Sequence, residues 1–344
     1  MVSIDTFIAG PLADVRAQAV AAEAEGVDGL WMGELNEDVF LYADRAVEHT
    51  SRVTVGTSIA VALARSPMTT AYLGYSLNRA AEGRFILGLG AQVRTQIEDR
   101  FGMPWDRPVA RMTEYVAALR AIWSSWQNGE RLHFAGDFYR HTSMDPPFTP
   151  PPSPYGPPKI YLAAVNPGMV RAAAAVADGM ILMLTPPDYL RERVLPAVEE
   201  GLAAAGRPRD EIEVCLAVAS FMGIVRVESE DELSAALDRH RGLVPYYFSV
   251  PNYRPMLELY GHGDLQPALH EIRYSDLPED LKWQRMAAMV PDELLLAVGT
   301  YASAETAPRR LREKYGTGVD RYLFGAGEFY EPWGTPKALR SVLA

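Results

Sequence analysis

Eight short apolar runs alternate with eight amphipathic stretches along this chain, and that alternation predicts an α/β fold, a (β/α)8 TIM barrel. The runs VTVGTSI and FILGLG are apolar without interruption, as strands buried on both faces are. The length of 344 residues and the 48% hydrophobic content suit one barrel with a sizeable core. We therefore expect a single domain spanning residues 1–344.

The expected strands are parallel, because a helix-like stretch separates each from the next. They lie near Ser3–Ile8, Gly29–Glu34, Val53–Ala60, Phe85–Gly90, Lys159–Val165, Met180–Leu184, Glu213–Val225 and Arg321–Gly325. The helices are expected within Leu12–Gly26, Val39–Thr50, Met68–Gly83, Arg107–Trp126, Gly168–Gly179, Tyr189–Gly206, Asp231–His240 and Ala304–Gly316. Glycine at position 26 is typical of a helix C-cap.

Two segments exceed a minimal barrel, and we expect both as insertions at its C-terminal face. The first, about residues 132–159, starts as a short hairpin around Gly136-Asp137 and continues as PPFTPPPSPYGPPK, too proline-rich for a helix or a central strand. The second, about residues 243–289, holds short helical pieces broken by proline and glycine. Its aromatic front, VPYYFSVPNYRPMLELYG, indicates either packing on the barrel or a lid over a site.

Composition narrows the class of partner to small molecules. The formal charge of −11, from 33 basic and 44 acidic side chains, argues against nucleic acid and against an anionic membrane. No apolar run approaches the ~18 residues of a membrane span, so a cytoplasmic protein is expected. The single cysteine, Cys215, lies in an apolar run and is expected to be a buried structural thiol. The six histidines show no metal-ligand spacing, and no metal is expected.

The segment Arg52–Trp105 sets two buried strands one helix apart, and both end in polar chemistry. Its strings GTSIAVALARSPMTTA and LGLGAQVRTQIEDRFGMPW resemble the luciferase-like class of flavin- and deazaflavin-dependent oxidoreductases, and the resemblance extends from about Asp5 to Phe324. It implies an enzyme that uses coenzyme F420 to move a hydride to or from a small organic substrate. An FMN-dependent monooxygenase is the alternative. A homodimer is also expected.

A non-enzymatic ligand-binding barrel is a second alternative, because Leu35 stands where members of the class often have a histidine. Glu34 precedes it at the end of an expected strand, where catalytic groups of α/β barrels gather, and we expect its carboxylate to point into the mouth of the barrel as the catalytic group. Arg65 in ALARSPM is equally consistent with a surface residue at a helix start and with a phosphate contact.

The resemblance also implies a set of cofactor contacts at the ends of three strands. Ser58-Ile59 is expected as a non-prolyl cis peptide that lies against the cofactor ring. Asn166 reads as a helix N-cap whose loop receives the cofactor phosphate. The expected cofactor-binding residues are Glu34, Ser58, Ile59, Gly90, Ala91, Gln92, Gln96, Ala163, Ala164, Val165 and Asn166.

Overall fold

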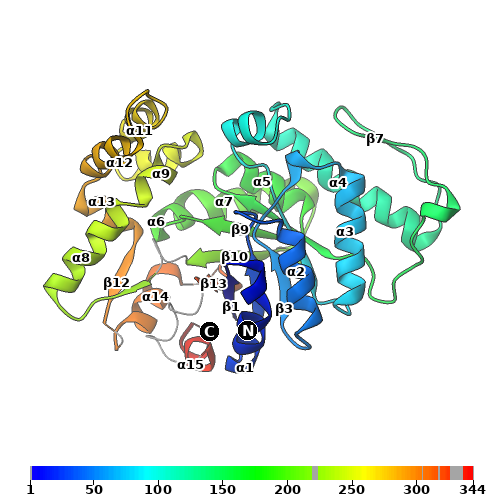
Figure 1. Ribbon diagram of the computed structural model, residues 1–344, viewed down its shortest axis with the longest axis horizontal. Coiled ribbons are helices and arrows are strands. Elements are labelled where there is room, and N and C mark those ends of the chain that lie inside the picture. The colour runs from blue at the N-terminus through cyan, green and yellow to red at the C-terminus, as the bar shows by residue number, and fades with distance from the viewer. Residues whose placement is uncertain (1, 219–223, 304, 317, 326–335, 344) are drawn as a thin grey trace.

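The computed structural model describes residues 2–218, 224–303, 305–316, 318–325 and 336–343, and its centre is a closed barrel of parallel strands (Figure 1). The strands around the barrel are β1 Ser3–Ile8, β2 Gly29–Met32, β3 Thr54–Thr57, β5 Phe85–Gly90, β8 Lys159–Ala164, β9 Gly179–Met183, β10 Glu213–Val218 and β13 Arg321–Phe324. Pairing of β3 with β5, in which Val55 faces Phe85, closes the ring. The predicted (β/α)8 barrel is confirmed.

Helices follow the strands and cover the outside of the barrel. The first helix ends at Gly26, whose left-handed φ of 91° makes it the predicted C-cap. The longer outer helices are α1 Val15–Glu25, α2 Val39–Glu48, α3 Pro67–Ala80, α4 Pro108–Asn128, α5 Pro167–Val176, α7 Leu195–Ala205, α8 Glu230–Arg241, α14 Ala307–Tyr315 and α15 Pro336–Leu343. The expected helix Tyr189–Gly206 is built from α6 Pro187–Tyr189, a π-helical turn η5 at Leu190–Val194, and α7.

Large side chains fill the part of the barrel interior that lies away from the C-terminal ends of the strands. Asp5 is fully buried and accepts hydrogen bonds from Arg321 Nε (2.7 Å), Arg321 Nη2 (3.0 Å) and Trp31 Nε1 (2.8 Å). The rings of Trp31 and Tyr161 pack at a centroid distance of 5.7 Å. Ile86, Ile181, Cys215 and Leu323 belong to the same cluster. The floor is therefore closed, and free space within the barrel can lie only toward the C-terminal ends of the strands.

The predicted seventh strand, Glu213–Val225, is wrong as one element. Its first part is the barrel strand β10, and its last part is β11 Ile224–Arg226, which pairs with β12 Thr300–Ala302 in a separate two-stranded sheet. Residues 219–223 lie outside the described residues. Ser220 and Gly223 are the only turn-type residues in this largely apolar run, and the prediction read across them. β12 and α13 Asp292–Val298 were not expected.

The hairpin of the first insertion reaches the start of α4, at the C-terminal end of the barrel, whereas its proline run lies along the outside of the barrel, so the prediction is wrong for the proline run. The hairpin itself is confirmed, with β6 Phe134–Ala135 antiparallel to β7 Arg140–His141, and its turn binds Glu114 near the start of α4. The chain then descends α3, where the Tyr72 hydroxyl donates to Phe148 O and Asn78 Nδ2 donates to Gly156 O. The reason is topological, because a connection from a helix to the next strand begins and ends at the N-terminal face.

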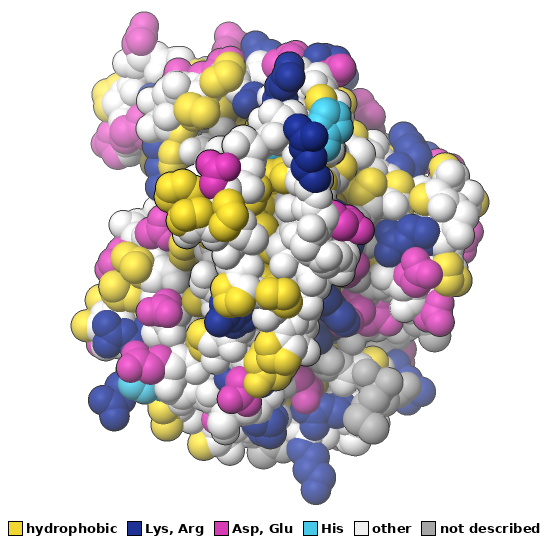
Figure 2. Space-filling view, turned by 90° about the vertical axis from the view of Figure 1, so that its right-hand side faces the viewer, with side chains coloured by type: hydrophobic (Ala, Val, Ile, Leu, Met, Phe, Trp, Pro, Cys, Tyr) yellow, Lys and Arg dark blue, Asp and Glu magenta, His cyan; other side chains and the backbone are white. Residues whose placement is uncertain are grey.

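Exposed apolar side chains mark this insertion. Phe148 and Tyr155 are 65% and 47% exposed, and most of the neighbouring prolines are exposed too. Figure 2 faces the side of the molecule that carries α3, α4 and β7, and hydrophobic side chains gather along its middle.

Candidate functional site

All eleven residues expected at the cofactor lie at the C-terminal ends of four neighbouring strands, or within a few residues beyond them. Glu34 follows β2, and Ser58 and Ile59 separate β3 from the two-residue strand β4 Ala60–Val61. Gly90 ends β5, with Ala91, Gln92 and Gln96 following it, and Ala163 and Ala164 end β8 before Val165 and Asn166. Because β2, β3, β5 and β8 are consecutive around the barrel, the structure brings these residues to one side of the mouth.

The Ser58–Ile59 peptide bond is cis, as predicted. It interrupts the third strand, and β4 then resumes pairing with β5, with Val61 opposite Gly90. The Ile59 side chain packs on the cluster inside the barrel and stays partly exposed. A Cβ atom added to Gly90 would lie 2.7 Å from Ile59 Cδ1, so a side chain at position 90 would displace the Ile59 side chain.

Glu34 is held in an ion pair at the strand ends, and its catalytic role stays a prediction. Its carboxylate forms a bidentate ion pair with Arg65, with both nitrogen–oxygen distances 2.7 Å, and Oε2 also accepts from the Val61 N–H at 2.7 Å. Only 7% of the Glu34 side chain and 14% of the Arg65 side chain are exposed. The two charged groups are therefore paired with each other and largely shielded from solvent.

Arg65 makes two further contacts that fix its guanidinium. Nη2 donates to Asp38 Oδ2 at 2.8 Å, and the group lies 5.3 Å from the centre of the Phe40 ring. Burial alone would lower the pKa of Arg65, but its bonds to Glu34 and Asp38 outweigh burial and raise it. Sequence reasoning left the role of Arg65 open. The available signal was an acid and a base at the ends of adjacent strands.

The loop after β5 is shaped by its backbone. Gln92 has a left-handed φ of 63°, and Gln96 opens a π-helical turn, η3 Gln96–Arg100. Arg100 Nη2 donates to the carbonyl of Leu35 at 2.9 Å, which ties this turn to the loop after β2. Ala91 is nearly buried, so its contact with any ligand would run through the main chain.

The residues at the end of β8 lie on different sides of the strand, one facing the barrel interior and the next facing the outer helices. Ala163 lies inside the barrel, since its Cβ is 3.5 Å from the Cβ position of Gly90, whereas Ala164 is buried in the layer packed against the helices. Asn166 is the predicted N-cap of α5, and its Oδ1 accepts from the Met169 N–H at 3.0 Å. The Asn166 side chain is thus used within the helix, and only main-chain N–H groups of this first turn remain to face an anion.

Small and apolar side chains line the inner wall above the filled floor. Phe7, Ile59 and Ala217 pack on the inner cluster and are partly exposed. A Cβ on Gly33 would lie 2.9 Å from Phe7 Cζ, so this position also faces inward. Phe7 and Ala217 were missed by sequence reasoning, although alternation along β1 and β10 places them on the same face as Asp5 and Cys215.

The helical insertion at residues 243–289 reaches the loops at this mouth. It consists of α9 Val244–Phe248, α10 Arg254–Leu259, α11 Leu265–Arg273 and α12 Glu279–Ala288, seen at the upper left of Figure 1. The Tyr274 hydroxyl lies 3.1 Å from Thr95 Oγ1 in the loop after β5, and the Tyr260 hydroxyl donates to Asp188 after β9 at 3.4 Å. The expected placement at the C-terminal face is confirmed for this insertion.

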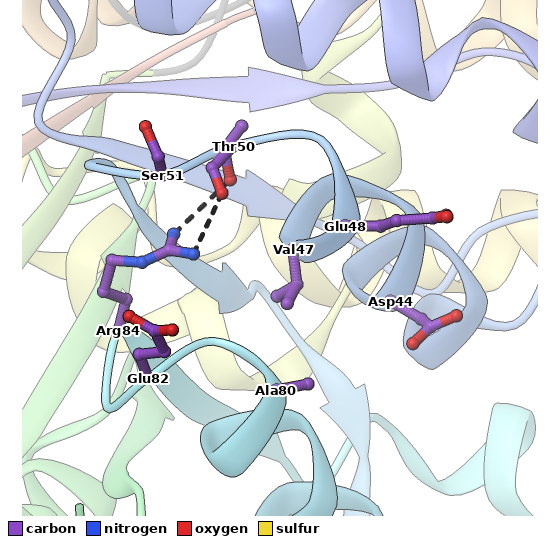
Figure 3. Close-up of a pocket in the computed structure, with 8 residues that line it drawn as sticks. All are labelled: Asp44, Val47, Glu48, Thr50, Ser51, Ala80, Glu82 and Arg84. Atoms are coloured by element: carbon purple, nitrogen blue, oxygen red, sulfur yellow. Dashed lines mark hydrogen bonds between the residues drawn. The ribbon is translucent and has the colours of Figure 1, made fainter.

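A surface hollow of ≈ 420 Å³ lies at the opposite face (Figure 3). Arg84 lies at its edge and donates to Thr50 O and Oγ1. The hollow is lined by Asp44, Val47, Glu48, Thr50, Ser51, Ala80, Glu82 and Arg84. These residues precede β3 and β5, whereas chemistry on α/β barrels takes place at the C-terminal strand ends, so the hollow does not compete with the mouth as the candidate site.

The described residues meet the requirements of neither a metal site nor a membrane-spanning helix. No group of three His, Cys, Asp or Glu side chains converges to hold a metal ion there. Within the same residues, no helix combines the length and apolar character that crossing a membrane requires.

The closed barrel and the interrupted third strand define a class of α/β-barrel proteins with a site at the C-terminal mouth. The sequence profile of the luciferase-like monooxygenases matches residues 4–321, and this chain belongs to that family. Members of the family are oxidoreductases, among them F420- and flavin-dependent enzymes. An uncharacterised protein of Mycobacterium tuberculosis is 44% identical over 321 residues, which cover 93% of this chain and 92% of the relative.

A second relative has a described activity. The phthiodiolone/phenolphthiodiolone dimycocerosates ketoreductase of M. tuberculosis is 29% identical over 259 residues, 66% of this chain and 65% of its own length.

Solved structures share the fold at lower identity. The F420-dependent tetrahydromethanopterin reductase of Methanopyrus kandleri has a TM-score of 0.75 at 20% identity, covering 99% of this chain and 97% of that one. An F420-dependent secondary alcohol dehydrogenase in complex with an F420-acetone adduct has a TM-score of 0.74 at 16% identity, covering 100% and 99%. An oxygenating component of a Pseudomonas putida monooxygenase, in complex with FMN, has a TM-score of 0.64 at 16% identity, covering 100% and 96%. At these identities the likeness concerns the fold.

Proposed function

We propose that this protein is an F420-dependent oxidoreductase that holds the deazaflavin at the C-terminal mouth of the barrel and reacts it with a small organic substrate. One observation carries the proposal. Above its filled floor, the inner wall is built from small or apolar residues, including Gly33, Ile59, Gly90 and Ala163. A flat, largely apolar ring fits such a wall, because partly exposed Phe7, Ile59 and Ala217 offer it apolar surface and the nearby Glu34 and Arg65 charges neutralise each other.

The bound deazaflavin would supply hydride transfer at its C5 carbon. Ile59 would lie against one face of the ring and leave the other face to the substrate. Main-chain groups of Ala91 and Gln92 would contact the polar edge of the ring. The cofactor phosphate would lie at the first turn of α5, where the N–H of Gly168 and the positive end of the helix favour an anion.

The comparisons favour hydride transfer to a carbonyl. The relative with a described activity is a ketoreductase, and two neighbours of the fold are F420-dependent enzymes, one of them an alcohol dehydrogenase. We therefore propose ketones and secondary alcohols as the first substrate class to test. The insertion at residues 243–289, tied to the mouth through Tyr260 and Tyr274, would form a wall of the substrate site.

FMN is the second candidate cofactor, since the fold neighbour from P. putida was solved in complex with it. The two cofactors make different demands. Reduced flavin reacts with oxygen and needs an enclosed, dry pocket for monooxygenation, whereas hydride transfer from a deazaflavin proceeds without oxygen. Turnover that requires oxygen would therefore identify the monooxygenase.

Equilibrium binding of F420 and of FMN to the purified protein tests the proposal directly, followed by turnover of ketones and secondary alcohols with and without air. Gly90→Val should abolish F420 binding, because its side chain would enter the space beside Ile59. The matched control Gly242→Val, at an exposed position after α8, should bind as wild type does. Thermal unfolding of both variants separates a blocked site from a lost fold. If the wild-type protein binds neither cofactor at micromolar concentration, the enzymatic proposal fails and a barrel with another ligand takes its place.

A further inference from the structure

Glu34 forms hydrogen bonds with the interrupted third strand on both sides of Ala60. Its backbone N–H donates to the carbonyl of Ile59 at 3.3 Å, and its carboxylate accepts from the N–H of Val61 at 2.7 Å. Arg65, a few residues further along the same segment, holds the carboxylate with two bonds of 2.7 Å. The position of Ile59 is therefore set by the end of the neighbouring strand as well as by its own backbone.

The Glu34–Arg65 ion pair is suited to holding residues 59–61 in one position. A buried ion pair gives little net stability, because desolvation of the two charges offsets their attraction. A bidentate guanidinium–carboxylate pair, however, fixes direction as well as distance. Here the second oxygen of Asp38 and the ring of Phe40 fix the guanidinium in turn. The pair thus holds one geometry.

That geometry determines where the Ile59 side chain lies. Ile59 contacts Gly90 so closely that even a methyl group on Gly90 would collide with it, and Ile59 packs on the inner cluster beside the mouth. A displacement of residues 59–61 would therefore move the inner wall on which the proposed ring rests.

We propose that the Glu34–Arg65 pair is a positioning clamp that sets Ile59 as the back wall of the cofactor site, and that neither charge acts on the cofactor itself. This inference rests on the proposed function, because a back wall has meaning only if a ring binds there. It assigns Glu34 a role different from the catalytic one that its place in the sequence indicates.

The test compares Glu34→Ala, Arg65→Ala and the double variant, with Glu200→Gln as control. Glu200 pairs with Arg171 on the surface, so the control also removes an acidic charge but leaves the mouth intact. The readouts are F420 and FMN affinity, the absorption band of the bound cofactor, and, without any cofactor, the δ1-methyl NMR resonance of Ile59 in isoleucine-labelled protein. Urea unfolding of each variant reports its stability.

The clamp predicts the same response from both single variants. Each should weaken cofactor binding by about tenfold or more, as loss of a charged hydrogen-bond partner does, and should shift both the absorption band and the Ile59 resonance. The double variant should be no worse than either single one, since both remove the same support. Glu34→Gln, which keeps an acceptor for Val61, should recover part of the affinity, and Glu200→Gln should match wild type.

Four results would overturn the clamp. Additive losses, with Glu34→Ala alone shifting the absorption band, would show that the carboxylate acts on the ring directly. Lower stability with unchanged affinity, absorption and Ile59 resonance would show a purely structural pair. If a single variant does not fold, Glu34→Gln and Arg65→Lys replace it with the same readouts. Failure of wild-type protein to bind either cofactor overturns the proposed function and this inference together, whereas wild-type binding with unaffected variants overturns the inference alone.

Discussion

Gly88 is the position at which the structure tolerates a side chain least. It lies in β5, and a Cβ atom there would be 1.7 Å from the carbonyl oxygen of Thr57 in the neighbouring β3. Its own carbonyl accepts a hydrogen bond from Thr57 Oγ1 at 2.6 Å. The contact lies on the seam where β3 and β5 close the barrel, and it involves main-chain atoms that cannot rotate away.

Gly88→Ala is therefore expected to destabilise the fold strongly. Ordinary contact requires the two backbones to separate by roughly 1.5 Å, and overpacking of this kind costs about 3 kcal/mol when flexible side chains cannot absorb it. Loss of the Thr57 hydrogen bond adds about 1 kcal/mol. With an unfolding entropy of about 2.1 cal/mol/K per residue, a total of about 4 kcal/mol lowers the melting temperature of this chain by roughly 5 °C.

The assay is urea unfolding followed by circular dichroism, supported by a calorimetric melting curve. The matched control is Gly242→Ala, which follows α8 with an ordinary φ of −76° and is exposed to solvent. Alanine there should change the stability by less than about 1 kcal/mol, because its restriction of the unfolded chain is offset by a close contact of 3.3 Å between its Cβ and Arg239 O. If Gly88→Ala lost less than about 1 kcal/mol, or behaved like the control, the seam would be more yielding than its geometry implies and the reasoning would be refuted.

Three further predictions concern single contacts, each measured by urea unfolding. Arg321→Met leaves the carboxylate of Asp5, fully buried in the barrel floor, without its charged partner, and should cost about 3–5 kcal/mol at pH 7, with a loss under about 1 kcal/mol contradicting this. For Glu23, burial raises the pKa, but hydrogen bonds from the backbone N–H groups of residues 51–53 outweigh it and lower the pKa. A carboxyl group whose pKa is lowered in the folded state contributes stability above its unfolded-state pKa of about 4.3, and this contribution is lost as the pH falls through the folded-state pKa. Glu23→Gln should therefore be about 1 kcal/mol less stable than wild type at pH 7 and should approach wild type below about pH 4. A difference in stability that does not depend on pH would count against this prediction. Asn166→Ala removes the N-cap of α5 and should cost about 1 kcal/mol, which Asn166→Asp should largely restore, and equal stability of all three proteins would rule out the cap.

The fold was predictable because its signals are local. Alternation of apolar runs with amphipathic stretches gives strand and helix positions from neighbouring residues alone, and a glycine such as Gly26 marks a helix end by its own backbone freedom. The cis bond at Ser58–Ile59 was predicted from family resemblance and is present. The seventh strand failed for the same reason that the others succeeded, since a largely apolar run is read as one strand even where the chain changes sheet, and the weak break at Ser220 and Gly223 was passed over.

The sequence by itself determined the barrel, the strand ends at which the candidate site lies and the family to which the chain belongs. Only the tertiary structure decided what the charged residues do there. Glu34 and Arg65 are 31 positions apart, and Asp5 and Arg321 are 316 apart, so no local pattern links them. Whether a carboxylate at a strand end faces the mouth or pairs with an arginine beyond the end of the next strand depends on register and on where that strand is interrupted, which are properties of the closed sheet rather than of any short segment.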